Sequence, residues 1–252
     1  MFSIWFLLVL LSIFIQVHSA PAVQKGGVKS VEPKILIFYK TIPYFHETIP
    51  TGINAIRKLG EQNGFVVDST NIATYFTEEN LNQYSAVVFL STTGDVLNGQ
   101  QQKAFKSYYQ KGKGFVGIHG AADTEYGWAW YNKLIGGHFA SHPSQLQNAT
   151  LNIVDQTFIT TKHLPKQWKR FDEWYNFQMT HWDKVHILIT IDETSYFGGE
   201  HGKIHPMSWY QDFDCGRSFY TQLSHQQDSY SDPLFLQHLL GGIQYAMTGI
   251  TI

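Results

Sequence analysis

The chain has 252 residues, a formal net charge of −2 and only 15% charged residues. It contains no basic block that could neutralise a run of phosphates, so nucleic acid is not expected as a partner. Its one cysteine, Cys215, excludes an internal disulfide framework, and the fold must therefore depend on its hydrophobic core.

The N-terminus has the pattern of a secretion signal. Residues 4–17 form an apolar run of signal-core length, and small residues at Ser19 and Ala20 suit signal peptidase. The run is too short for a good membrane anchor, so no stable membrane insertion is expected. An uncleaved anchor is the alternative, because no Lys or Arg precedes the run.

This pattern sets the expected domain organisation. Residues 1–20 are expected to be a signal peptide, 21–33 a flexible leader, and 34–249 a single domain of ordinary size. The expected location is therefore extracellular. The triplet Asn148-Ala149-Thr150 is a sequon, so Asn148 is the expected glycosylation site of a secreted glycoprotein. The sequence leaves the oligomeric state open.

The first half of the domain alternates strand and helix patterns. Continuous runs of β-branched and aromatic residues predict buried strands at 35–39, 65–67, 87–90 and 115–118. Helical patterns between them predict a helix from Pro50 to Gly64, a short helix that Thr77 caps, and a helix over 100–110. Such strict alternation predicts right-handed crossovers and a parallel sheet.

The second half is less regular. Strand-like runs at 149–154, 185–191, 207–210 and 218–223 predict antiparallel additions to the sheet. Pro233 begins a final helix, whose apolar residues lie on one buried stripe. The predicted fold class is therefore α/β, with helices and sheet in a three-layer sandwich around a mostly parallel sheet.

The stretch GIHGAADTEY, from Gly117 to Tyr126, follows the fourth predicted strand and carries one imidazole and two carboxylates. Open α/β sheets place their chemistry at the carboxyl ends of strands. Gly117 and Gly120 flank His119, and we expect a sharp turn that directs its side chain out over the sheet edge. Glycines beside a histidine can also simply ease a turn, so a structural role is the alternative.

Several short motifs occur in a specific order along the chain. They are Lys40-Thr41 with Phe45-His46, Thr92-Thr93-Gly94-Asp95, GIHGAADTEY with Trp128, His142-Pro143, Asp172-Glu173-Trp174-Tyr175-Asn176, His205-Pro206 with Trp209, and Gly216-Arg217 leading to Phe219-Tyr220-Thr221 and His225. Together they resemble the ThuA-like, or trehalose-utilisation, family over nearly the whole mature chain. The resemblance implies a class I glutamine-amidotransferase-like fold of the flavodoxin-like type and a role in carbohydrate metabolism.

The related amidotransferases place a nucleophilic cysteine at the turn after this strand and a histidine after a later strand. Here His119 takes the position of that cysteine, whereas Cys215 lies just before a strand rather than at a turn. The chain is therefore not expected to be a glutamine amidotransferase. His225 is similar in place to the amidotransferase base, although Ser224 stands before it where the family commonly has glycine.

We expect the motifs to meet in one pocket. The catalytic candidates are His119, Asp123, Glu173 and His225, because an imidazole titrates near neutral pH and a carboxylate can orient it or act as a second acid or base. The substrate-binding candidates are His46, Asp95, Tyr126, Trp128, His142, Trp174 and Tyr175. Aromatic rings beside carboxylates suit a sugar. The alternative is that these aromatic residues belong to the core.

A metal site is a second interpretation of the histidines. His119, His142 and His225 are the candidate ligands, and zinc would activate water or polarise a carbonyl there. The pairs His138/His142 and His201/His205 have helical ligand spacing, but the proline after each pair disfavours a helix. In the third interpretation most histidines are structural. No cofactor is therefore certain, and no phosphate-binding loop predicts a nucleotide.

The sequence predicts action on a small carbohydrate, either a disaccharide or an oxidised sugar, by hydrolytic or acid/base chemistry. A hydrolase or an isomerase-type enzyme fits this expectation. The alternative is a sugar-binding module that has kept the cleft without turnover.

Overall fold

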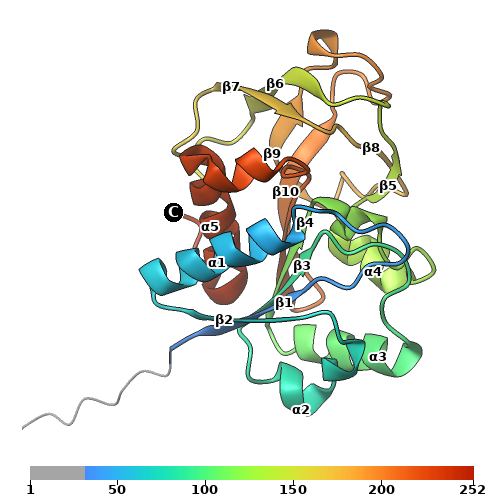
Figure 1. Ribbon diagram of the computed structural model, residues 1–252, viewed down its shortest axis with the longest axis vertical. Coiled ribbons are helices and arrows are strands. Elements are labelled where there is room, and N and C mark those ends of the chain that lie inside the picture. The colour runs from blue at the N-terminus through green and yellow to red at the C-terminus, as the bar shows by residue number, and fades with distance from the viewer. Residues whose placement is uncertain (1–31) are drawn as a thin grey trace, which may run out of the picture. The chain divides into compact units, whose positions relative to one another are not determined.

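A nine-stranded sheet organises the protein, with helices on both of its faces (Figure 1). The structure is a computed structural model that describes residues 32–252. The expected signal peptide at 1–20 and nearly all of the expected leader at 21–33 lie outside the described residues. Within residues 32–252, no helix is long and apolar enough to cross a membrane.

Five parallel strands form one half of the sheet. In spatial order they are β2 (Val66–Thr70), β1 (Lys34–Phe38), β3 (Ala86–Leu90), β4 (Gly114–Ile118) and β11 (Gly216–Thr221). β3 and β4 are buried along their entire length, which explains why their sequences are continuous apolar runs without alternation. The predicted parallel sheet is confirmed.

The other half of the sheet is antiparallel. Beyond β11 the order continues with β10 (Pro206–Phe213), β9 (His186–Ile191), β6 (Gln147–Ile153) and β7 (Gln167–Asp172), and a separate two-stranded sheet joins β5 (His138–Ser141) to β8 (Asn176–Gln178). Three of the predicted antiparallel additions, β6, β9 and β10, are confirmed. The fourth, predicted at 218–223, is wrong, because this segment is β11 and pairs parallel to β4. β5, β7 and β8 were not predicted. In β7 the buried positions are Trp168, Arg170 and Asp172, so its buried face has no apolar pattern.

The helices form the two outer layers. α1 (Ile49–Asn63) and α5 (Pro233–Thr248) contact each other and the parallel strands, while α2 (Glu78–Leu81), α3 (Gly99–Tyr109) and α4 (Ala129–Ile135) lie on the other side of the sheet (Figure 1). Short 3-10 turns occur at η1 (Ala73–Tyr75), η2 (His119–Asp123), η3 (Glu193–Ser195) and η4 (Gln227–Ser231). The predicted three-layer sandwich is confirmed, although α4 was not predicted.

The predicted helix boundaries have clear physical causes. Pro50 lies in the first turn of α1, and Gly64 ends that helix in a left-handed conformation with φ 71°. Asn98 and Gln101 form a capping box that begins α3. Asp232 accepts a hydrogen bond from Leu234 N and begins α5.

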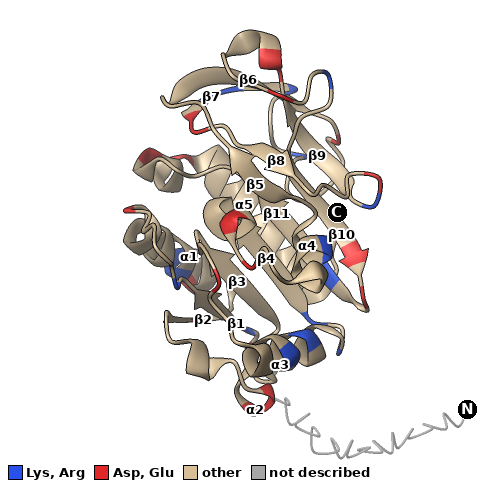
Figure 2. Ribbon diagram, turned by 90° about the vertical axis from the view of Figure 1, so that its right-hand side faces the viewer, with Lys and Arg blue, Asp and Glu red and all other residues tan. Residues whose placement is uncertain are grey.

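Charged side chains are spread over the surface. Figure 2 shows Lys and Arg in separate groups on the face that it presents, one of them along α3. The expectation that nucleic acid is not a partner stays a prediction.

His238 of α5 is a buried, uncharged member of the core. Its Nδ1 lies 2.9 Å from the carbonyl oxygen of Thr160, and its Nε2 lies 3.2 Å from the hydroxyl of Thr221. Burial, followed by smaller effects of neighbouring charges, lowers the pKa of His238 to about 3.

This histidine predicts acid sensitivity. The unfolded chain protonates His238 at its ordinary pKa of 6.5, whereas the folded chain does not do so until about 3, so its contribution to stability is present above pH 6.5 and is lost as the pH falls. At pH 5 the loss is about 2 kcal/mol. His238→Gln keeps one donor and one acceptor without titrating in this range. In urea unfolding, the free energy of unfolding should fall less between pH 7 and pH 5 for the variant than for the native chain. Equal falls would contradict this assignment.

Candidate active site

Four side chains from distant parts of the chain meet at one edge of the sheet. β1, β4 and β11 run parallel, so their carboxyl ends lie at the same edge. His46 follows β1, His119 follows β4, His225 follows β11, and Glu173 comes directly after β7. Each offers one nitrogen or oxygen atom, and these four atoms all lie within 4.8 Å of one another. We refer to these four residues as the histidine–glutamate cluster.

His119 occupies the predicted turn. Its φ of 49° lies in the left-handed region, which confirms a sharp, strained turn directly after β4. At the sheet edge, however, the side chain is covered by other rings. It is fully buried, and its ring packs against Tyr175, His46 and His225 with centroid distances of 4.6, 4.8 and 5.1 Å.

The hydrogen bonds of His119 define its tautomer. Nδ1 lies 2.7 Å from the carbonyl oxygen of Gln222, which can only accept, so Nδ1 carries the hydrogen. In the neutral ring Nε2 therefore presents a lone pair. That atom lies 3.0 Å from the Tyr175 hydroxyl and 3.1 Å from Nδ1 of His225.

Glu173 is an ionised group in contact with three histidines. Its Oε2 lies 3.4 Å from His119 Nε2 and 3.2 Å from His225 Nδ1, and its Oε1 lies 3.4 Å from His142 Nδ1. Burial acts to raise the pKa of Glu173, but hydrogen bonds and positive charge from His119 and His225 in their protonated forms outweigh it and hold this pKa well below its usual range. Burial likewise acts to lower the pKa of His225, and the bond to Glu173 reverses that effect and raises it.

His46 completes the cluster as a neutral ring. It is only 5% exposed, and burial, followed by the charges of His119 and His225, lowers its pKa to about 2. Its Nδ1 has no hydrogen-bond partner in the part of the chain that the structure describes. The close approach of the ring favours glycine at position 120, because a Cβ atom there would lie 3.0 Å from His46 Cε1 and 3.1 Å from the carbonyl oxygen of Thr92, and its neighbours would have to shift.

Asp172 holds the two loops of the cluster together. Its Oδ1 accepts hydrogen bonds from the backbone N–H groups of Glu173 and His225, both at 3.0 Å, and its Oδ2 accepts one from Ser224 N at 2.9 Å. The carboxylate is fully buried. Sequence reasoning did not select Asp172 as a site residue, and its position next to Glu173 was the only signal.

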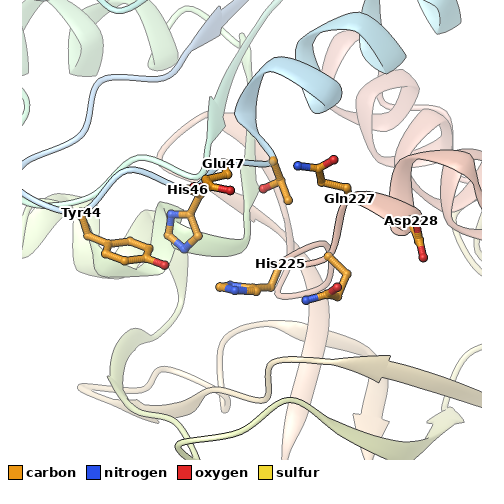
Figure 3. Close-up of a pocket in the computed structure, with 8 residues that line it drawn as sticks. Tyr44, His46, Glu47, His225, Gln227 and Asp228 are labelled. Atoms are coloured by element: carbon orange, nitrogen blue, oxygen red, sulfur yellow. The ribbon is translucent and has the colours of Figure 1, made fainter.

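Two cavities lie beside the cluster. The first has a volume of about 420 Å³ and is lined by residues that include Tyr44, His46, Glu47, His225, Gln227 and Asp228 (Figure 3). The second has a volume of about 430 Å³ and includes Asp123, Phe139, His142, Glu173 and Tyr175. Both cavities are lined by Tyr44, His46 and His225, so these three side chains stand between them.

Several other expected site residues also reach the second cavity. Asp123, His142 and Tyr175 line it. The hydroxyl of Tyr126 lies 2.8 Å from Asp123 Oδ1 and 2.8 Å from the carbonyl oxygen of Phe139, so Tyr126 supports Asp123 from behind. Burial raises the pKa of Asp123, although the bond from Tyr126 acts in the opposite direction.

Four expected substrate-binding residues line neither cavity, namely Asp95, Tyr126, Trp128 and Trp174. Trp174 is 1% exposed, and its Nε1 donates to the carbonyl oxygen of Gln147 at 2.9 Å. Trp128 packs against Trp130 at a centroid distance of 4.9 Å. These two rings belong to the core, as the alternative interpretation proposed. Asp95 is exposed at the surface.

Cys215 and Asn148 both lie away from the cluster. Cys215 occupies the turn between β10 and β11 with φ 71°, so the expectation that it does not lie at a turn is wrong. That turn precedes β11, at the opposite end of the strand from His225. Asn148 is an exposed residue of β6, and its glycosylation stays a prediction.

Comparison with known proteins identifies the family. The model of the ThuA family, described as trehalose utilisation, matches residues 34–246. The chain belongs to the ThuA family. No curated protein matches it.

Solved structures show the same ThuA fold. A protein from Bacteroides uniformis described as ThuA-like is 22% identical, with a TM-score of 0.73 over 90% of this chain and 95% of the other. A ThuA-like protein from Parabacteroides merdae is 20% identical, with a TM-score of 0.72 over 88% and 92%. A cytoplasmic protein from Salmonella typhimurium is 10% identical, with a TM-score of 0.62 over 86% and 99%. At these identities the likeness concerns the fold alone.

At one departure from the usual ThuA pattern, the backbone has a conformation that favours glycine. Ser224 stands where the family commonly has glycine, yet it has φ 98°, a conformation that favours glycine. Its Oγ lies 3.1 Å from the hydroxyl of Tyr230, and its N–H donates to Asp172. These bonds hold the serine in the conformation that places His225 beside Glu173.

We predict that Asp172→Asn destabilises the protein. An amide has only one oxygen, so its NH₂ group takes the place of the other carboxylate oxygen. A backbone N–H that donated to that oxygen then has no acceptor. The free energy of unfolding should fall by about 1–3 kcal/mol in urea denaturation. Asp228→Asn, at an exposed position of the same region, is the matched control and should change stability by less than about 0.5 kcal/mol. Equal stability of the two variants would contradict the role of Asp172.

Proposed function

We propose that this ThuA-family chain is an enzyme that acts on a carbohydrate of two sugar units, by hydrolytic or acid/base chemistry at the histidine–glutamate cluster. One observation carries the proposal: two cavities of about 420 and 430 Å³ share Tyr44, His46 and His225 as a common wall. A disaccharide lying across this wall would place the bond between its sugars at the cluster. The family description, trehalose utilisation, supports a sugar as the ligand.

The lining of the cavities suits a sugar. Glu47, Gln227 and Asp228 border the first cavity and offer partners for hydroxyl groups. Phe139 borders the second and offers a flat apolar surface for the C–H face of a sugar ring, and the nearly buried Tyr175 packs against it. Polar groups among aromatic surfaces provide both orientation and contact area.

Asp123 is the proposed general acid. It borders the second cavity, and burial raises its pKa, so this carboxyl group retains a proton at higher pH than an exposed aspartate. In hydrolysis, the cluster takes one proton from a water molecule, whose oxygen attacks the acetal carbon and forms the new C–O bond. Asp123 donates its proton to the departing sugar oxygen as the glycosidic C–O bond breaks.

Asp123→Asn tests this role, because the amide keeps the shape but cannot deliver the proton. Disaccharides and their keto forms should be screened for turnover by the native chain. The variant should then lose about 10²–10⁴-fold in kcat with an unchanged fold. Asp183→Asn, at an exposed loop position, is the control and should keep full activity.

The second candidate function is a sugar-binding module on the same fold. The complete burial of His119 favours it, because the residue at the catalytic turn does not reach either cavity. Saturable sugar binding without any turnover, measured by calorimetry across the same panel, would support the module and contradict the enzyme.

We further propose that the protein is secreted after cleavage of a signal peptide near residue 20 and is glycosylated at Asn148. The apolar N-terminal run and the exposed sequon support this proposal. Expression in a secretory eukaryotic host should yield protein in the culture medium, and enzymatic removal of glycans should increase its electrophoretic mobility. Asn148→Gln should abolish that increase. Retention in the cell, or an unchanged mobility of the native chain, would contradict it.

A further inference from the structure

We propose that the histidine–glutamate cluster binds one divalent transition-metal ion of the zinc type, with His119, Glu173 and His225 as its protein ligands and His46 beside the open fourth position. The proposal rests on the proposed function only for the part that the ion plays in turnover. Binding of the ion itself does not depend on the identity of the substrate.

The distances between the three ligand atoms match a tetrahedral site. Zinc binds nitrogen and carboxylate oxygen at about 2.0–2.1 Å, which places tetrahedral ligand atoms about 3.3–3.4 Å apart. His119 Nε2, His225 Nδ1 and Glu173 Oε2 are separated by 3.1, 3.2 and 3.4 Å. The three atoms thus form one face of a tetrahedron with only small adjustments.

The ligand atoms also have the correct chemistry. His119 donates its Nδ1 hydrogen to the carbonyl oxygen of Gln222, which leaves the Nε2 lone pair directed at the cluster. Metal-binding histidines commonly donate their other ring N–H to a carbonyl or carboxylate in this way. Glu173 adds the negative charge that a divalent ion requires.

An ion satisfies all three atoms at once. Each lies within 3.4 Å of the other two, but a hydrogen carried by one can point at only one neighbour. His119 is fully buried and the Glu173 side chain is 9% exposed, whereas His225 is 20% exposed and borders both cavities, so the cluster is open on one side only. A central cation contacts all three atoms at once, and the Tyr175 hydroxyl, 3.0 Å from His119 Nε2, would then turn to another acceptor.

The surroundings hold the ligands in place. Asp172 binds the backbone N–H groups of both Glu173 and His225, and the side-chain amide of Gln222 donates to the Glu173 carbonyl oxygen at 2.7 Å. Such outer contacts orient ligands before an ion arrives.

The open position faces the proposed substrate. His46 contributes to both cavities, and a ring nitrogen of it lies within the 4.8 Å that contains all four atoms. Three protein ligands with a free fourth position are typical of catalytic zinc sites, where the ion makes bound water a nucleophile near neutral pH.

Calorimetry on tag-free protein, after removal of metals with a chelator, tests the site. Titration with Zn²⁺ should give one ion per chain, and Co²⁺ should give the visible absorption bands of a tetrahedral complex. Mg²⁺ and Ca²⁺ should not bind at the same concentrations, because they prefer sites made of oxygen atoms. No binding of Zn²⁺, or several weak sites instead of one, would overturn the proposal.

Matched variants locate the ion. Glu173→Gln keeps the size of the side chain but removes its charge, and it should weaken Zn²⁺ binding by more than about 100-fold, beyond the loss typical of outer-shell changes. His142→Gln is the control, because His142 also lies 3.4 Å from Glu173 but contacts Oε1 rather than Oε2. The Zn²⁺ affinity of this variant should change by less than about tenfold. Equal affinities for Glu173→Gln and the native chain would overturn the proposal, provided that circular dichroism shows both folded.

The metal site and the proposed enzyme activity can be tested independently of each other. One tightly bound Zn²⁺ without turnover of any sugar would support the metal site and contradict only the enzyme. Full turnover by protein shown to be free of metal would contradict the part of the ion in catalysis and leave the enzyme in place.

Discussion

The candidate active site depends on one buried carboxylate. β7 is the outermost strand of the antiparallel half, and β11 lies four places further in. The segments that follow these two strands nevertheless meet at the histidine–glutamate cluster. Asp172 joins them, because it accepts hydrogen bonds from the backbone N–H groups of Glu173, Ser224 and His225. A buried carboxylate with three such donors is well satisfied, whereas any neutral replacement leaves donors unpaired. The positions of Glu173 and His225 therefore follow from Asp172.

Much of the fold could be predicted because the central parallel strands β1, β3 and β4 are buried on both faces and appear as apolar runs. The meeting of His46, His119 and His225 follows from the same fact, since residues after parallel strands gather at one edge. β7 could not be found in this way, because Arg170 and Asp172 occupy its buried face and pair with groups that are distant in sequence.

The orientation of side chains was harder to predict than their position. Glu173 and Tyr175 reach the cluster, whereas Trp174 between them enters the core. Extended backbone is expected to alternate side chains in this way, but the sequence does not reveal which residues face which side. The glycines beside His119 predicted its turn but not the rings that cover it. Burial depends on those neighbours, which come from other elements, and a local motif contains no information about them.

The common wall of Tyr44, His46 and His225 has a consequence for the release of products in the proposed hydrolysis. Glu47 and Asp228 on one side and His142 on the other are exposed, so each chamber has its own exit to solvent. The two fragments of a divided ligand would then depart by separate routes, and neither would have to wait for the other.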